Sequence, residues 1–180
     1  MDITVIPDIE HSKVALEKIN IKAPGTCGEF IQGALNGEDF LINCPINLFS
    51  YAQVRKVSVE GLHFSKNEHY SKVRDTLLLA ADQFSFPLNY HVRIRSAIPR
   101  GKGMASSSAD IAAVFEAVCQ QSNISLSPEA FAHIVTEVEP SDCVNFSGIS
   151  HINHLTGQLI SSMPAPKDMS VLVVDCGGEV

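Results

Sequence analysis

Hydrophobic and polar positions alternate along the first third of the chain, a pattern that predicts strands. Ile19 and Ile21 alternate with polar neighbours and lead into Ala23-Pro24-Gly25, where a turn is expected. Further strands are predicted over 30–35, 40–43 and 48–59, with Asn36-Gly37 as a tight hairpin and Cys44-Pro45 as a second break. The first sixteen residues show no clear period, and we expect an extension or an edge strand there.

The middle of the chain changes to a helical period. Apolar residues three and four apart predict a helix over 69–84, and period-2 alternation over 90–94 predicts a strand ahead of Pro99. Ser127 and Pro128 mark the start of another helix, expected to reach about Val138, because serine caps a helix and proline fits its first position. A helix between them is predicted from one apolar stripe, formed by Ile111, Phe115, Val118 and Cys119.

The last third predicts a hairpin and one further strand. The hairpin joins 149–152 to 158–162 around Thr156-Gly157, and 171–174 reads as a short buried strand. The chain shows no repeat, low-complexity tract or long linker. Because the order is mixed and begins with sheet, we expect an α+β fold rather than a regular alternation of strands and helices.

Composition and charge narrow the class of protein. A chain of 180 residues makes one ordinary domain or one lobe of a larger protein, and 45% hydrophobic residues suffice for a core. The net charge of −7 argues against a dedicated nucleic-acid or anionic-membrane binder. An odd number of cysteines without a C-x-x-C pair predicts reduced thiols, and no run approaches the length needed to cross a bilayer, so we expect a soluble, cytoplasmic protein.

One segment has the composition of an anion cradle, and it joins a predicted strand to a predicted helix. Its glycines let the backbone aim N–H groups at a ligand, its cations add positive charge, and its hydroxyls can reach a phosphate oxygen or Mg²⁺. The spacing is neither that of a Walker A loop nor that of a dinucleotide fingerprint. Composition alone fits a flexible turn with a serine cap equally well. The cradle would comprise Pro99, Arg100, Gly101, Lys102, Gly103, Met104, Ala105, Ser106, Ser107 and Ser108.

The same segment resembles the second motif of the GHMP kinases, P-x-x-x-G-L-G-S-S-A, with Met104 in place of leucine and Ala105 in place of the second glycine. Residues 22–30 resemble the first motif of that family, A-P-G-K-x-x-x-G-E, with Thr26 in place of the usual lysine and a shorter spacing to Gly28-Glu29. The sequences of residues 25–33, 43–45 and 101–107 are similar to those of one branch of this family, the L-threonine kinases of cobalamin synthesis and salvage. The replaced lysine is normal in that branch.

The resemblance, which covers roughly 18–152, implies a mixed-sheet N-terminal lobe packed with helices. It implies transfer of the γ-phosphoryl group of ATP to the hydroxyl of L-threonine, with Mg²⁺ as cofactor. Homoserine kinase or another small-alcohol kinase of the family is the alternative.

The resemblance also assigns roles to residues. Asp142 matches a catalytic carboxylate that accepts or orients the hydroxyl proton, although the residue type alone fits a capping aspartate in a loop equally well. Glu29 and Gln32 lie where family members contact substrate. Ser106 and a glutamate are expected at the metal; either Glu137 or Glu139 fits, and we favour Glu137.

Other residues with chemical potential receive no role. Cys27 and Cys143 are expected to be small apolar residues. His151 and His154 would point to opposite faces of a strand, which disfavours a shared metal ion. The charged helix face with Lys72, Arg74 and Asp75 is expected to be solvated surface.

The resemblance also sets the expected domain division. A kinase of this family is about twice the size of one ordinary domain, so 1–165 is expected to be the N-terminal ATP-binding domain. Residues 166–180 would begin a C-terminal lobe that is missing. Two functions therefore remain open: an active small-molecule kinase, or an inactive nucleotide-binding or assembly lobe. The expected partners are ATP, a small alcohol, and either a second copy or a complementing C-terminal lobe.

Overall fold

The computed structural model describes residues 18–65 and 70–178, so the extension or edge strand predicted for the first sixteen residues lies outside the described residues. The fold is α+β, as predicted, with the helices packed on a mixed sheet. In chain order its elements are β1 (Ile19–Leu35), β2 (Glu38–Lys56), β3 (Gly61–Phe64), α1 (Ser71–Phe84), β4 (Asn89–Ser96), α2 (Ser106–Ser122), α3 (Pro128–Val138), β5 (Ile149–Ile152) and β6 (Leu159–Met163).

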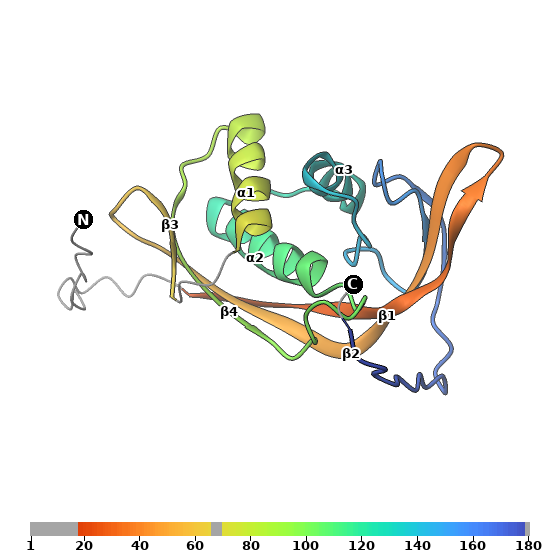
Figure 1. The fold of residues 1–180 in the computed structure, drawn as a ribbon. Helices are drawn as coiled ribbons and strands as arrows, with labels where there is room; N and C mark the ends of the chain where they lie inside the picture. The colour runs from red at the N-terminus through yellow and green to blue at the C-terminus, as the bar shows by residue number, and fades with distance from the viewer. Residues whose placement is uncertain (1–17, 66–69, 179–180) are drawn as a thin grey trace.

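One sheet organises the described chain. Its strand order is β3-β4-β2-β5-β6, with β1 also paired to β2. All pairs are antiparallel except β3 with β4, which run parallel. The three helices lie on one face of this sheet, and the tip of the β1–β2 hairpin extends away from them (Figure 1). One face of the sheet is therefore covered by helices, and the other is open.

The core lies between the helices and the sheet. Ala52, Val54 and Val92 alternate along β2 and β4 and are buried on the helix side. Helix α2 packs against β1, β2, β4 and α1, and it is buried on most of its sides. The single apolar stripe predicted for this helix is therefore too narrow, because α2 lies between the sheet and another helix.

The strands of the N-terminal third are longer than predicted. The turn expected at Ala23-Pro24-Gly25 is wrong: β1 runs through it, with a register shift between Pro24 and Thr26. β2 likewise continues through Cys44-Pro45. An irregularity in pairing lets a strand tolerate proline, which cannot donate to the ladder. The hairpin at Asn36-Gly37 is confirmed, with φ of 55° and 84°, and β3 is a strand that the sequence pattern did not predict.

The C-terminal third is partly as expected. The β5–β6 hairpin is confirmed, and a Cβ on Gly157 would come 2.6 Å from the backbone of Ala132 in α3, which explains the glycine. The buried strand predicted over 171–174 is wrong. This segment forms no strand, and Leu172 is 89% exposed. No helix in the described residues is long and apolar enough to cross a membrane.

Candidate active site

The two sequence motifs meet in space at the start of α2. The backbone N–H of Thr26 in β1 donates to the carbonyl oxygen of Met104, at 3.2 Å. Gly25 precedes this contact, and a Cβ there would lie only 2.7 Å from the same carbonyl oxygen. Only glycine lets the strand come this close, so Gly25 fixes the first motif against the second.

Left-handed residues alternate along the backbone of the predicted cradle. Gly101, Gly103 and Ala105 all have positive φ, at 64°, 63° and 56°. Ala105 is the N-cap of α2, and no side chain caps this helix. The first N–H groups of α2 therefore lack the serine cap of the alternative interpretation, and together with the helix dipole they favour an anion. Ser106, Ser107 and Ser108 form the first turn.

Asp142 lies beside this first turn. The hydroxyl of Ser108 donates to Oδ2 of Asp142 at 3.3 Å. The backbone around Asp142 is fixed from two sides: Asn43 Nδ2 donates to its carbonyl oxygen, and the hydroxyl of Ser141 lies 3.5 Å from that of Ser108. The loop after α3 is thus held between β2 and α2, and it places the predicted catalytic carboxylate at the cradle.

Of the two candidate metal-binding glutamates, the structure brings only Glu139 to the cradle. The hydroxyl of Ser107 donates to Glu139 Oε1 at 3.0 Å, and Lys72 forms an ion pair with the same carboxylate. Glu137 instead lies on the exposed side of α3, 3.7 Å from Nε2 of His133. Helix α3 ends at Val138, and the extended backbone of Glu139 leaves the helical path. Glu139 therefore lies at the cradle, whereas the favoured Glu137 does not, and Lys72 is not purely solvated surface.

The two cations of the cradle both have partners. Arg100 Nη2 lies 3.1 Å from Oδ2 of Asp110, which is buried and also accepts from the hydroxyl of Ser50 at 2.5 Å. The guanidinium of Arg100 also stacks 5.3 Å from the ring centroid of Tyr70. A hollow of about 210 Å³ lies between these groups and the first turns of α1 and α2. It is large enough to accept part of a ligand whose phosphates rest on the cradle.

Lys102, the second cation, contacts the C-terminal segment. Its Nζ lies 2.9 Å from Asp175 Oδ1 and donates to the carbonyl of Gly178 at 2.7 Å. This contact, more than the backbone N–H of Gly177, holds the pKa of the exposed Asp175 below its usual value. The segment after β6 therefore reaches the cradle through an ion pair and a hydrogen bond, both made by Lys102.

The predicted substrate-binding residues flank the Asp142 loop at different distances. The backbone of Glu29 lies opposite Asn43, the residue that holds Asp142. Gln32 is farther along β1 and exposed, and its Nε2 lies 3.3 Å from Nε2 of His154, whose carbonyl accepts from Ser141 N–H. The backbone of Glu29 thus lies at the edge of the site. Gln32 is linked to the site through His154.

Metal and thiol chemistry can be limited further. Within 18–65 and 70–178 no cluster of three His, Cys, Asp or Glu side chains is suited to hold a metal ion. Mg²⁺ that arrives with nucleotide phosphates needs only one or two protein carboxylates, and Glu139 lies at the first turn of α2. Burial raises the pKa of Cys143 to about 12, so this thiol is unreactive although it follows Asp142.

Sequence reasoning missed two buried polar residues that shape the site, Asn43 and Asp110. Both sit where the pattern demands an apolar side chain: Asn43 follows Leu41 on the covered face of β2, and Asp110 lies in the apolar part of α2. A polar residue at a core position was the available signal, because such residues persist only where they are hydrogen-bonded.

Comparison with known proteins finds both a family match and curated relatives. Residues 71–151 match the model of the GHMP kinases N-terminal domain. The L-threonine kinase of Salmonella typhimurium is 33% identical over 156 residues, which cover 84% of this chain and 50% of that protein. The L-threonine kinase of Citrobacter freundii is 30% identical over 156 residues, covering 86% and 53%. The chain thus spans about half the length of these curated relatives.

A solved structure supports the fold independently of close sequence similarity. The mevalonate kinase of Methanococcus jannaschii superposes with a TM-score of 0.60 at 14% identity, over 86% of this chain and 57% of that one. The chain thus contains a GHMP kinase N-terminal domain over residues 71–151, in a fold that it shares with this mevalonate kinase.

Proposed function

We propose that this chain is the ATP-binding part of a kinase that phosphorylates the hydroxyl of L-threonine. One observation carries the proposal: an uncapped helix start with three left-handed residues before it lies within one hydrogen bond of a carboxylate, Ser108 to Asp142 at 3.3 Å. Phosphoryl transfer needs these two parts together, a cradle for the phosphates and a group for the attacking hydroxyl. The similarity to two L-threonine kinases supports L-threonine as the substrate.

Each group in the site receives one role. The N–H groups from Gly101 to Ser106 hold the phosphates of ATP. Ser106 and Glu139 hold Mg²⁺, which offsets phosphate charge when bound. Asp142 accepts the proton as the hydroxyl oxygen bonds to the γ-phosphorus, and the bond to the bridging oxygen of ADP breaks. Glu29 and Gln32 contact the amino acid.

The domain division is part of the same proposal. We assign 1–165 to the ATP-binding domain and 166–180 to the beginning of a second lobe that completes the substrate pocket. The exposed apolar run at 171–174 is consistent with a segment that packs only when that lobe is present. A cytoplasmic location and a role in cobalamin synthesis or salvage also belong to the proposal.

The test is ADP production by the chain with Mg²⁺-ATP and a panel of L-threonine, L-serine, L-homoserine and mevalonate. We expect turnover with L-threonine, reduced by about 10²–10⁴-fold in Asp142→Asn with little change in ATP affinity. Turnover selective for L-homoserine would make L-homoserine the substrate in place of L-threonine. Undiminished turnover in Asp142→Asn would contradict the role of Asp142 as proton acceptor.

Nucleotide binding gives a second readout that does not require turnover. Ser106→Ala is expected to weaken Mg²⁺-ATP binding, whereas Ser125→Ala, an exposed serine between α2 and α3, should not. ATP binding without turnover on any alcohol would favour the other candidate, a nucleotide-binding lobe completed by a second lobe, consistent with the half-length match to the relatives.

A further inference from the structure

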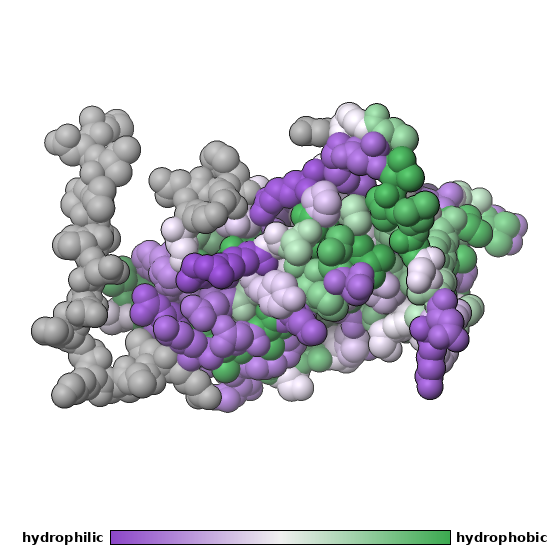
Figure 2. Space-filling model, turned by 90° about the horizontal axis from the view of Figure 1, so that it is seen from below, coloured by the Kyte–Doolittle hydropathy of each residue, from purple (hydrophilic) through white to green (hydrophobic). Residues whose placement is uncertain are grey.

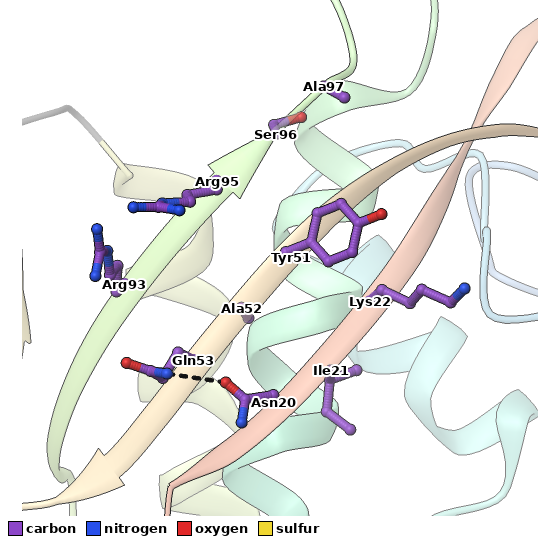
Figure 3. Close-up of a pocket in the computed structure, with 10 residues that line it drawn as sticks. All are labelled: Asn20, Ile21, Lys22, Tyr51, Ala52, Gln53, Arg93, Arg95, Ser96 and Ala97. Carbon is purple, nitrogen blue, oxygen red and sulfur yellow. Dashed lines mark hydrogen bonds between the residues drawn. The ribbon is translucent and has the colours of Figure 1, made fainter.

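The open face of the sheet carries a hollow of about 810 Å³ that lies outside the candidate active site (Figure 3). It is lined by β1, β2 and β4 at the end of the sheet near β3. Its size falls within the usual range for small-molecule sites. No residue that lines it belongs to the cradle or contacts Asp142.

The side chains of this hollow form two rows across three strands. Strand register places Lys22 beside Tyr51 and Tyr51 beside Arg95. In the next row, Asn20 lies beside Gln53 and Gln53 beside Arg93. Direct cross-strand partners point to the same face of a sheet, so the three cations and Tyr51 share one surface.

In the described part of the chain, these cations form no ion pair with a carboxylate. Among the described residues, no Asp or Glu oxygen lies within 4.0 Å of Lys22, Arg93 or Arg95. The ammonium group of Lys22 instead lies over the ring of Phe49, 4.4 Å from its centroid, in a cation–π contact. A protein with net charge −7 thus keeps unpaired positive charge in one hollow.

The surroundings strengthen the positive potential. Arg55 occupies the same face of β2, and burial together with the charges of Arg55, His63 and Arg93 lowers the pKa of His91. Seen from below, hydrophilic side chains gather on the left of the described surface, whereas hydrophobic patches at the centre and right lie among further hydrophilic ones (Figure 2). The hydrophilic left side is the part of the sheet where β4 lies.

We propose that this hollow binds a small polyanion with two or more phosphate groups, at a second site separate from the cradle. Arginine forks bind phosphate oxygens in pairs, and Arg93 and Arg95 stand two residues apart on one strand, so each can hold one phosphate group. Lys22 lies on the other side of Tyr51 from Arg95, and its ammonium group points away from the arginines (Figure 3). Tyr51, 49% exposed between Lys22 and Arg95, offers a ring face for an organic part of the ligand.

The experiment is a titration of the isotope-labelled chain with pyrophosphate, followed by amide NMR. We expect saturable shifts at 20–22, 51–53 and 93–97, separate from those of the cradle at 99–108. Arg93→Ala and Arg95→Ala should each weaken the first set by at least about tenfold. The cradle signals should keep their affinity in both variants, which makes them an internal control and separates this site from the proposed kinase function.

The matched control is Arg74→Ala, which removes the same charge from the exposed surface of α1. Shifts confined to 99–108, or equal weakening in Arg74→Ala, would overturn the proposal, the latter because the attraction would then be non-specific charge. Sedimentation adds a third outcome. If the chain forms a dimer that the Arg95→Ala substitution dissociates but pyrophosphate does not, the surface would bind a second copy of the chain. That result would also overturn the proposal.

Discussion

The two faces of the sheet are built from the same strands and differ in what their side chains contact: helices and buried polar groups on one face, solvent on the other. On the helix-covered face, Val54 and Val92 are fully buried, and the site above them is fixed by backbone contacts and buried polar groups. On the open face, the alternate residues Tyr51 and Arg93 are exposed. Changes on the covered face should therefore alter folding and catalysis together, whereas changes on the open face should alter only what binds there.

The largest expected effect comes from Asp110→Ala on the covered side. It removes the partner of Arg100 and the acceptor of the Ser50 hydroxyl, which is itself fully buried. A buried donor left unpaired, with the lost charge contact, should lower the free energy of unfolding by about 2–3 kcal/mol. Urea unfolding measures it, with Asp75→Ala on the exposed face of α1 as control. Equal stability of the two variants would show that Asp110 does not anchor the site.

Gly25→Ala should follow closely, because it acts on the contact between the two motifs. The added Cβ would meet the carbonyl oxygen of Met104 at 2.7 Å, and backbone cannot move aside as cheaply as a side chain. We expect a loss of about 1–3 kcal/mol by urea unfolding. Gly33→Ala on the same strand is the control, because its Cβ would meet only the Phe40 ring at 3.6 Å. A Gly25→Ala chain as stable as Gly33→Ala would mean that this close approach is not required.

Most elements of the covered face could be predicted from the sequence because their signals are local. Ser127 accepts from the N–H of Ala130, as a capping serine before Pro128 should, and α3 begins where expected. The Asn36-Gly37 hairpin follows from residues that tolerate positive φ. Pro24, in contrast, suggested a turn, because the register shift that keeps it inside β1 depends on its partner strand.

Long-range placement explains the remaining errors. The run 171–174 is apolar enough for a strand, but a strand also needs a neighbour, and no pattern within the run supplies one. Glu137 and Glu139 are two residues apart, and only the end of α3 at Val138 decides which of them reaches Ser107. The basic rows of the open face require strand register, since Lys22 and Arg95 are far apart along the chain.

Asn43→Ala tests whether the covered face positions the chemistry as well as the fold. The variant removes the donor to the carbonyl of Asp142, and the carboxylate that we propose as catalytic should shift from Ser108. We expect turnover to fall on the order of 10-fold to 100-fold with ATP affinity nearly unchanged, while stability falls by only about 1 kcal/mol. Asn47→Ala, exposed on the same strand, is the control. Parallel losses in turnover and ATP affinity would indicate a general disturbance instead of a positioning role.

The smallest effect is expected on the open face, from His91→Gln. Burial comes first and nearby positive charge second in lowering the pKa of His91, so the folded chain resists protonation of this ring. The unfolded chain, with the ordinary value, takes up the proton first. Stability should therefore fall as the pH drops below about 6.5 and level off below the folded pKa. His91→Gln should flatten that part of the profile, measured as Tm against pH, and leave stability above pH 7 nearly unchanged. An unaltered acid slope would show that protonation of His91 does not contribute to the loss of stability in acid.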